Sequence, residues 1–200
     1  MLKKISGILL SIIFIALVFS QIHCAQKQEE MTENKETHLE RGKYLVDLGG
    51  CNHCHSPKVM TAIGPVPDTT KLLSGSPDII NSVDFKPKLV AQGKYVVCTG
   101  DLTCWFGPWG ISHAANLTPD KETGIGDWTA AMFIKAMRTG KHIGDGRPIL
   151  PPMPWQDIGK LNDQDLNDIF AYLQSLKPIS NKVPDPVTPD ELAKLNGTEK

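Results

Sequence analysis

The stretch Cys51-Asn52-His53-Cys54-His55 decides how this 200-residue chain is interpreted. Its two cysteines lie three positions apart, and a histidine directly follows the second. This spacing lets two thiols reach the two vinyl groups of one porphyrin while the adjacent histidine reaches the iron. We therefore predict one covalently attached haem c at Cys51 and Cys54, with His55 as an axial ligand of the iron.

Two other kinds of site use a Cys-x-x-Cys pair, and the sequence argues against both. A zinc site needs further ligands at suitable spacing, and the nearest spare cysteines, Cys98 and Cys104, do not form a second such pair. A thioredoxin-like pair follows a strand, whereas this motif follows a helical pattern that ends at Gly49-Gly50. Haem attachment is the interpretation that fits.

The opposite axial position has its best candidate in Met153, within Ile149-Leu150-Pro151-Pro152-Met153-Pro154-Trp155. Prolines on both sides fix φ and remove backbone donors, so the loop holds the thioether in one place. His113 and His142 are the competing ligands, and either would give bis-histidine ligation without such a loop. His/Met ligation leaves no place for a small-molecule substrate at the iron, which predicts electron transfer rather than catalysis.

The first 23 residues have the plan of an export signal, in which two lysines precede an apolar run that ends at Phe19. Cys24 follows, and this arrangement resembles a bacterial lipoprotein signal, in which such a cysteine is lipidated. Ordinary cleavage near Ala25 and an uncleaved anchor stay open, although the run is shorter than the about 20 residues of a spanning helix. Each alternative places the folded part in the periplasm or on the outer face of a bacterial membrane.

Composition sets the size of the fold and the class of partner. The chain is 40% hydrophobic and 22% charged, which suits one well-cored domain. Its 21 basic and 22 acidic residues form no basic stripe, so we expect no nucleic-acid partner. Redox proteins of the cell envelope, and a membrane reached through the lipid anchor, are the partners expected.

Helical periodicity predicts three helices in the domain, over 39–48, 130–138 and 162–176. Thr129 and Asn162 are the N-caps expected for the second and third, and Gly140 ends the second. A flexible tether is expected at 24–38, and a Pro-rich tail with one short helical turn at 179–200.

Residues 57–118 are rich in Gly, Pro, Ser and Asn without a long helical pattern, which predicts an inserted irregular lobe. Within it, β-prone runs at 95–98 and 102–106 flank Thr99-Gly100-Asp101, which predicts a tight hairpin. In an oxidising compartment, Cys98 and Cys104 on its arms are expected to form a disulfide, with free thiols or metal ligation as alternatives.

The order of these features resembles the class I cytochromes c of the bacterial monohaem type. The shared features are a helix with Gly42, then CNHCH, Gly64-Pro65, PPMPW and a terminal helix with Ala171-Tyr172-Leu173. The resemblance covers 39–178 apart from the lobe, and it implies an all-α cytochrome c fold around one covalent haem. It also implies that Gly42 crosses near Tyr172 and Leu173, and that the Pro65 carbonyl accepts a hydrogen bond from Nδ1 of His55.

These features predict a one-electron carrier of the cell envelope. Residues 116–120 and 124–129 also resemble stretches in cytochromes that accept electrons as subunits of periplasmic dehydrogenases, so such a subunit is the first alternative. A haem enzyme or gas sensor in which Met153 is displaceable is another, and a lipoprotein whose haem only stabilises the fold is the last.

Overall fold

A computed structural model describes residues 34, 37–77 and 93–197. The predicted export signal, Cys24 and most of the predicted tether lie outside the described residues. Within the described part of the chain, no helix is both long and apolar enough to cross a membrane.

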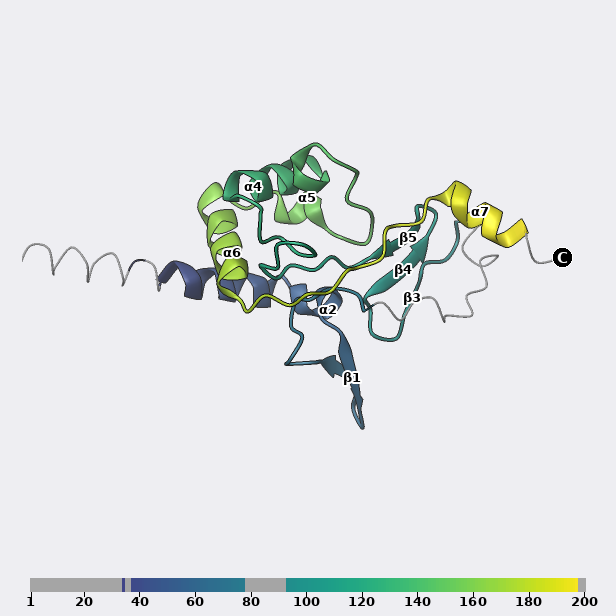
Figure 1. The fold of residues 1–200 in the computed structure, drawn as a ribbon, viewed down its shortest axis with the longest axis horizontal. Coiled ribbons are helices and arrows are strands. Elements are labelled where there is room, and N and C mark those ends of the chain that lie inside the picture. Colours follow the sequence, from purple (N-terminus) through teal and green to yellow (C-terminus); the bar gives the residue numbers. More distant parts are fainter. Residues whose placement is uncertain (1–33, 35–36, 78–92, 198–200) are drawn as a thin grey trace, which may run out of the picture.

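The core of the fold is helical (Figure 1). Its elements are a first helix at 37–48, α2 (Cys51–His55), α4 (Ala130–Thr139), the short 3-10 helix η2 (His142–Gly144), α5 (Trp155–Ile158) and α6 (Asp163–Ser175). Helix α4 packs against η2, α5 and α6. The buried residues that these elements share are Leu45, Val46, Leu73, Ile125, Phe133, Ala136, Met137, Leu166, Ile169, Phe170 and Leu173.

The predicted helix ends are confirmed at three positions. The Thr129 hydroxyl accepts a hydrogen bond from the backbone N–H of Met132 at 3.2 Å, and the Asn162 side chain accepts one from Asp165 at 2.7 Å. Gly140 ends α4 in the left-handed conformation, with φ 65°. Each of these residues satisfies backbone groups that a helix terminus leaves open.

Gly42 sets the crossing of the first helix with α6. A Cβ at Gly42 would lie 2.0 Å from the Asp168 carbonyl oxygen and 2.8 Å from Cβ of Tyr172. Only a residue without a side chain permits this approach of the two helices. The expected contact between Gly42 and Tyr172 is therefore confirmed.

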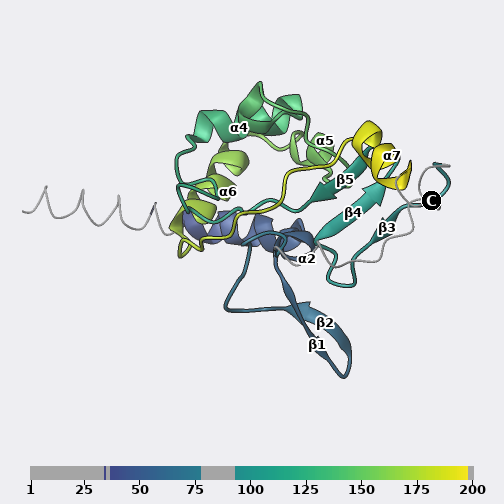
Figure 2. The same ribbon diagram turned by 45° about the vertical axis from the view of Figure 1, so that its right-hand side comes forward.

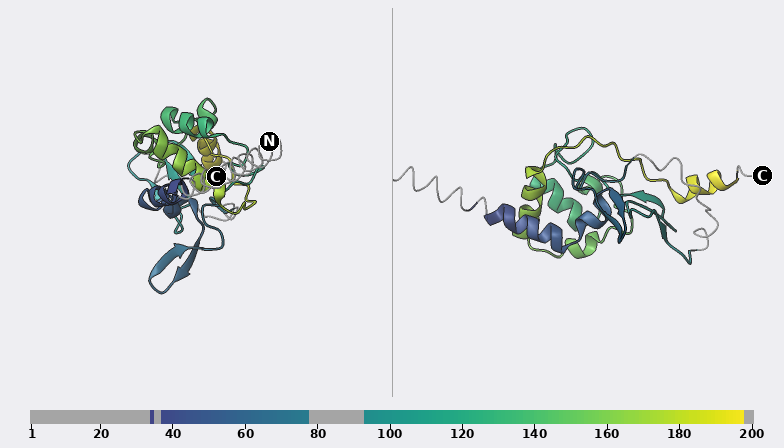
Figure 3. Two further views of the ribbon diagram at one scale, coloured as in Figure 1. Left: turned by 90° about the vertical axis from the view of Figure 1, so that its left-hand side faces the viewer. Right: turned by 90° about the horizontal axis from the view of Figure 1, so that it is seen from below.

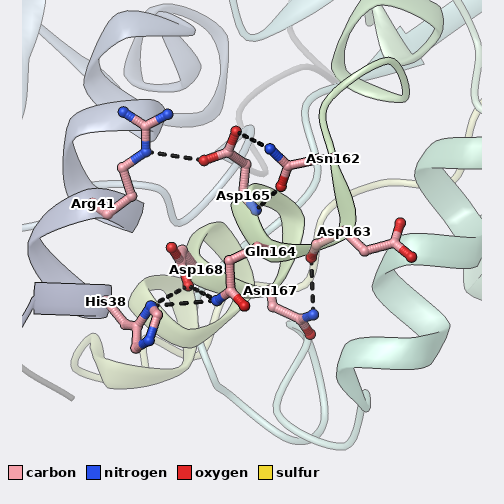
Figure 4. Close-up of polar contacts among 8 residues, drawn as sticks. All are labelled: His38, Arg41, Asn162, Asp163, Gln164, Asp165, Asn167 and Asp168. Carbon is pink, nitrogen blue, oxygen red and sulfur yellow. Dashed lines mark hydrogen bonds and ion pairs between the residues drawn. The ribbon is translucent and has the colours of Figure 1, made fainter. Parts of the chain in front are cut away.

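Polar contacts lie beside this crossing (Figure 4). Nε of Arg41 donates to the Asp165 carboxylate at 2.9 Å, and Nδ1 of His38 lies 2.9 Å from the Asp168 carboxylate. Arg41 is exposed, so its ion pair adds little free energy. The close packing at Gly42 is what fixes how the helices cross.

Within 57–118, the described residues form two antiparallel sheets as well as loops. Strand β1 (Lys58–Thr61) pairs with β2 (Gly64–Pro67), and β3 (Val97–Cys98), β4 (Cys104–Gly107) and β5 (Gly110–His113) form a sheet in that order. The hairpin predicted around residues 99–101 lies between β3 and β4. The β1–β2 hairpin, which sequence reasoning did not predict, projects away from the helical body (Figures 1 and 2).

The segment predicted as a Pro-rich tail packs on the domain. It runs across the body from α6 to α7 (Pro189–Gly197), which contacts β5 and is longer than the predicted single turn (Figure 3). The Asn181 side chain donates to the carbonyls of Ser74 and Ser76 at 2.7 and 2.9 Å. Val187 and Ile111 exchange two backbone hydrogen bonds at 2.9 and 3.0 Å. The folded domain therefore continues beyond residue 178.

Candidate functional site

Helix α2 carries the three residues of the predicted haem motif. Gly50 has φ 64°, a left-handed conformation that turns the chain from the first helix directly into α2. Cys51 and Cys54 are half-buried and lie about one turn apart on α2, which places them on one side of it. His55 follows at the end of the helix and is buried.

His55 is held in the tautomer that a metal ligand needs. Its Nδ1 lies 2.8 Å from the carbonyl oxygen of Ala115. A carbonyl can only accept, so Nδ1 carries the proton and Nε2 keeps a free lone pair. Burial also lowers the pKa of His55, which favours the neutral ring. A buried neutral imidazole with Nε2 available fits axial ligation of haem iron.

The prediction for Pro65 is wrong, because Ala115 provides the carbonyl that His55 contacts. Pro65 is exposed and pairs with Met60 in the β1–β2 hairpin, which carries it away from the helical body. Ala115 has no sequence signature, since every residue has a backbone carbonyl. The path of the chain after β5 is what brings the Ala115 carbonyl to His55.

Backbone hydrogen bonds hold Ala115 in place beside α2. The N–H of Gly75 donates to the His55 carbonyl at 2.7 Å, and that of Ser76 donates to the Ala114 carbonyl at 2.8 Å. Gly75 has φ 85°, and a Cβ there would lie 2.7 Å from the Ala114 carbonyl oxygen. Glycine is therefore required at 75 for segment 113–116 to approach His55.

The two thiols of α2 do not suit the rival redox chemistry. Burial raises the pKa of Cys51 to about 11 and also raises that of Cys54. A reactive dithiol needs a lowered thiol pKa, so the pair differs from a thioredoxin-like site. Among the described residues, no group of three or more His, Cys, Asp or Glu side chains could hold a metal ion.

Met153 lies in the loop between η2 and α5. It is half-buried and packs against the main core, as Cys51 does. Its N–H donates to the Leu150 carbonyl at 3.4 Å, and the Pro151 carbonyl accepts a hydrogen bond from Ser112 at 2.6 Å. The structure thus brings the Met153 loop and the haem motif to one core, while ligation by Met153 stays a prediction.

The two competing histidines lie on other elements. His142, on η2, meets the Trp128 ring edge-on at 5.0 Å, so it is half-buried rather than directed at solvent. His113, on β5, lies opposite Cys104, and its Nδ1 is the one buried side-chain polar atom without a hydrogen-bond partner among the described residues. Burial lowers the pKa of each ring.

Cys98 and Cys104 are free thiols in the structure. Cys98 pairs with Trp105 across β3 and β4, and Cys104 is the residue before Trp105. Because side chains alternate between faces along a strand, this register places the two cysteines on opposite faces of the sheet. The predicted disulfide has no support from this register and stays a prediction.

Comparison with known proteins gives several relatives, and no family model matches the chain. The chain is 42% identical over 77 residues to one subunit of the nicotinate dehydrogenase of Pseudomonas putida, covering 38% of this chain and 6% of that protein. It is 31% identical over 146 residues to the cytochrome c subunit of alcohol dehydrogenase (quinone) of Gluconobacter oxydans. This match covers 64% of this chain and 29% of that protein. It is 26% identical over 147 residues to a diheme c-type cytochrome of Cereibacter sphaeroides. This match covers 73% of this chain and 38% of that protein. The chain therefore spans well under half the length of each of these relatives.

Proposed function

We propose that this chain, a c-type cytochrome by its similarity to such proteins, accepts electrons as the cytochrome part of a dehydrogenase in the bacterial cell envelope. The similarity to the cytochrome c subunit of alcohol dehydrogenase (quinone) supports an electron-transfer part rather than a catalytic one. The observation that carries the haem-binding part of the proposal is the geometry of His55, whose Nδ1 contacts the Ala115 carbonyl at 2.8 Å and leaves Nε2 for iron.

The proposal includes one haem c, bound through Cys51 and Cys54, with His55 and Met153 as axial ligands in a cytochrome c fold. The sequence has one Cys-x-x-Cys-His motif. The relative named as diheme is matched over 38% of its length, less than half, which suits a match to one haem-bearing part. When bound, haem c supplies exchange of a single electron at its iron.

The residues of this chain would keep the iron site closed to substrate. The Ala115 carbonyl orients the His55 ring, and the Pro-rich loop limits movement of Met153. If His55 and Met153 both held the iron, no position would remain there for a substrate. Such a site passes electrons between proteins, and the partner subunit would carry out the substrate chemistry.

We also propose attachment to the outer face of a membrane through lipidated Cys24. This part rests on the export-type segment that precedes Cys24 in the sequence. Intact mass of the envelope-purified protein tests it, because diacylglycerol and the loss of residues 1–23 change the mass together. A mass that corresponds to cleavage near Ala25 contradicts lipidation.

Haem attachment is tested by expressing the full chain in a host that matures c-type cytochromes. We expect haem staining after denaturing electrophoresis and a mass increase equal to one haem. The double variant Cys51→Ala, Cys54→Ala loses both signals, and the matched control His53→Ala, which changes the exposed residue between the cysteines, keeps them. Staining that survives loss of both cysteines would contradict attachment at α2.

The partner is tested by purification of the tagged chain from envelopes of its native host. We expect a larger subunit to co-purify, and addition of that subunit's substrate to reduce the haem. If the cytochrome purifies alone and is reduced only by other small redox proteins, the free one-electron carrier is the better interpretation. Tight binding of carbon monoxide by the wild-type protein would favour the haem enzyme or gas sensor.

A further inference from the structure

We propose that Ser112 is a positioning residue for Met153, because its hydroxyl ties the Met153 loop to the β3–β5 sheet. This inference rests on the proposed His/Met ligation and assigns the residue that maintains it. Ser112 lies on β5, far from residue 153 in the sequence, and it is not part of the haem motif.

A chain of two hydrogen bonds connects the sheet to the loop. Nε1 of Trp109 lies 3.2 Å from Oγ of Ser112 and donates to it. Oγ of Ser112 in turn donates to the Pro151 carbonyl at 2.6 Å. Ser112 is only 8% exposed, so water competes weakly for these groups. The Ser112 hydroxyl therefore accepts a hydrogen bond from Trp109 and donates its own proton to the Met153 loop.

Besides the packing of Met153 on the core, few other hydrogen bonds hold the loop. Pro151, Pro152 and Pro154 have no backbone N–H to donate. The N–H of Met153 donates within the loop, to Leu150, at a long 3.4 Å. Among the hydrogen bonds of the described residues, the one from Ser112 alone ties positions 151–153 to another element. Its loss would free this part of the loop from the sheet.

The same short segment also reaches His55. Ser112 contacts the loop of the proposed Met ligand, and Ala115, three residues later, contacts Nδ1 of His55. Between them, the N–H of Ala114 donates at 2.8 Å to the carbonyl of Thr103, the residue before β4, which holds the segment beside that strand. Segment 112–115 thus links the elements that carry both proposed axial ligands. Since a thioether is a weak ligand, the anchor on its loop affects how often it stays bound.

The test is Ser112→Ala in the full haem-loaded chain. We expect covalent haem to be retained, the far-red sulfur-to-iron band to weaken, and the affinity of the reduced protein for carbon monoxide to rise roughly three- to tenfold, as for the loss of one hydrogen bond. Ser112→Thr, which keeps the hydroxyl, restores the wild-type values. Trp109→Phe, which removes the donor to Ser112 and keeps an aromatic ring, gives a smaller change in the same direction.

Ser175→Ala is the matched control, because it removes an exposed hydroxyl that donates only to Tyr172 within α6. Its spectrum and carbon monoxide affinity should equal those of the wild type. If Ser112→Ala lowers the free energy of unfolding but leaves the band and the carbon monoxide affinity unchanged, Ser112 is merely structural and the inference is overturned.

Met153→Ala separates the proposed His/Met ligation from the proposed role of Ser112. If it removes the far-red band while Ser112→Ala behaves like the wild type, His/Met ligation stands and the role of Ser112 falls. If Met153→Ala leaves the band unchanged, the proposed ligation itself fails, and the role of Ser112 fails with it.

Discussion

The two sheets of the inserted segment, β1–β2 and β3–β5, differ in how much of their surface is buried. Both are antiparallel and both come from residues 57–118. The β1–β2 hairpin projects from the body (Figure 2). Its Met60 and Ile63 side chains are 76% and 93% accessible. The β3–β5 sheet buries Cys104 and Phe106 and is bound to the C-terminal segment by the bridge between Ile111 and Val187.

The difference shows which part of the insertion belongs to the functional site. The strand β5 and the residues after it contact the Met153 loop through Ser112 and His55 through Ala115. The hairpin β1–β2 lies directly after the haem motif in sequence, yet it supplies no hydrogen bond to His55 among the described residues. Lys58 of β1 does donate to the carbonyls of Asn52 and Ser56, but proximity in the chain does not identify the partner of His55.

The largest effect is expected from Phe106→Ala. Phe106 is 3% exposed in the small core of the β3–β5 sheet, so truncation removes apolar burial and leaves a cavity. We expect the free energy of unfolding to fall by roughly 3–5 kcal/mol. Chemical denaturation of the haem-loaded protein measures it, and a loss below about 1 kcal/mol would show that this sheet packs as loosely as the hairpin.

A smaller effect is expected from Gly110→Ala, for which Gly64→Ala is the matched control. Both glycines have positive φ, 98° and 113°, so alanine is strained at each. At Gly110 the new Cβ would also lie 1.9 Å from the Val187 carbonyl oxygen, whereas at Gly64 nothing lies within 4 Å. We expect Gly110→Ala to lower the free energy of unfolding by roughly 2–4 kcal/mol in the same denaturation experiment. This loss is about 1–2 kcal/mol larger than that of Gly64→Ala. Equal losses would mean that the contact with Val187 contributes nothing.

His113 should make the β3–β5 region sensitive to acid. Burial lowers its pKa below the ordinary value of 6.5, so the unfolded chain binds the proton more readily than the folded chain. Stability is then lost as the pH falls through about 6.5, where the unfolded histidine becomes charged. We expect His113→Phe to lose less unfolding free energy than the wild type between about pH 7.5 and about pH 5. Urea denaturation at several pH values measures this difference, and identical pH slopes would refute it.

The smallest effect is expected from Ile63→Ala at the tip of the β1–β2 hairpin. The side chain is almost fully accessible, so its truncation removes little buried area. The free energy of unfolding should change by no more than about 0.5 kcal/mol, and haem attachment should be unaffected. A loss of unfolding free energy comparable to that of Phe106→Ala would show that the hairpin packs as tightly as the β3–β5 sheet.

Several features were predictable because specific side chains carry them. Thr129 and Asn162 cap helices through oxygens that most residue types lack, and Gly42 permits a helix crossing that any side chain would block. The spacing of Cys51, Cys54 and His55 is likewise visible in the sequence, although the helix α2 that carries them was not predicted. Such features depend on residue type and local order, so they are visible without coordinates.

Other features depended on how distant segments pack together. The predicted contact of Pro65 with His55 failed because a two-stranded hairpin carries Pro65 outward, and the end of the domain was misplaced because Asn181 and Val187 bind the body. The register of β3 against β4 places Cys98 and Cys104 on opposite faces of the sheet, which a count of residues between them does not show, and their disulfide stays a prediction.

Residue types in order thus predicted the haem motif and the candidate Met153, and they identified the helix caps. The partner of His55 and the anchor of the Met153 loop became visible only in three dimensions. The physical reason is that both contacts end on backbone carbonyls, at Ala115 and Pro151, and every residue has such an oxygen. Long-range packing alone selects which carbonyl meets which donor.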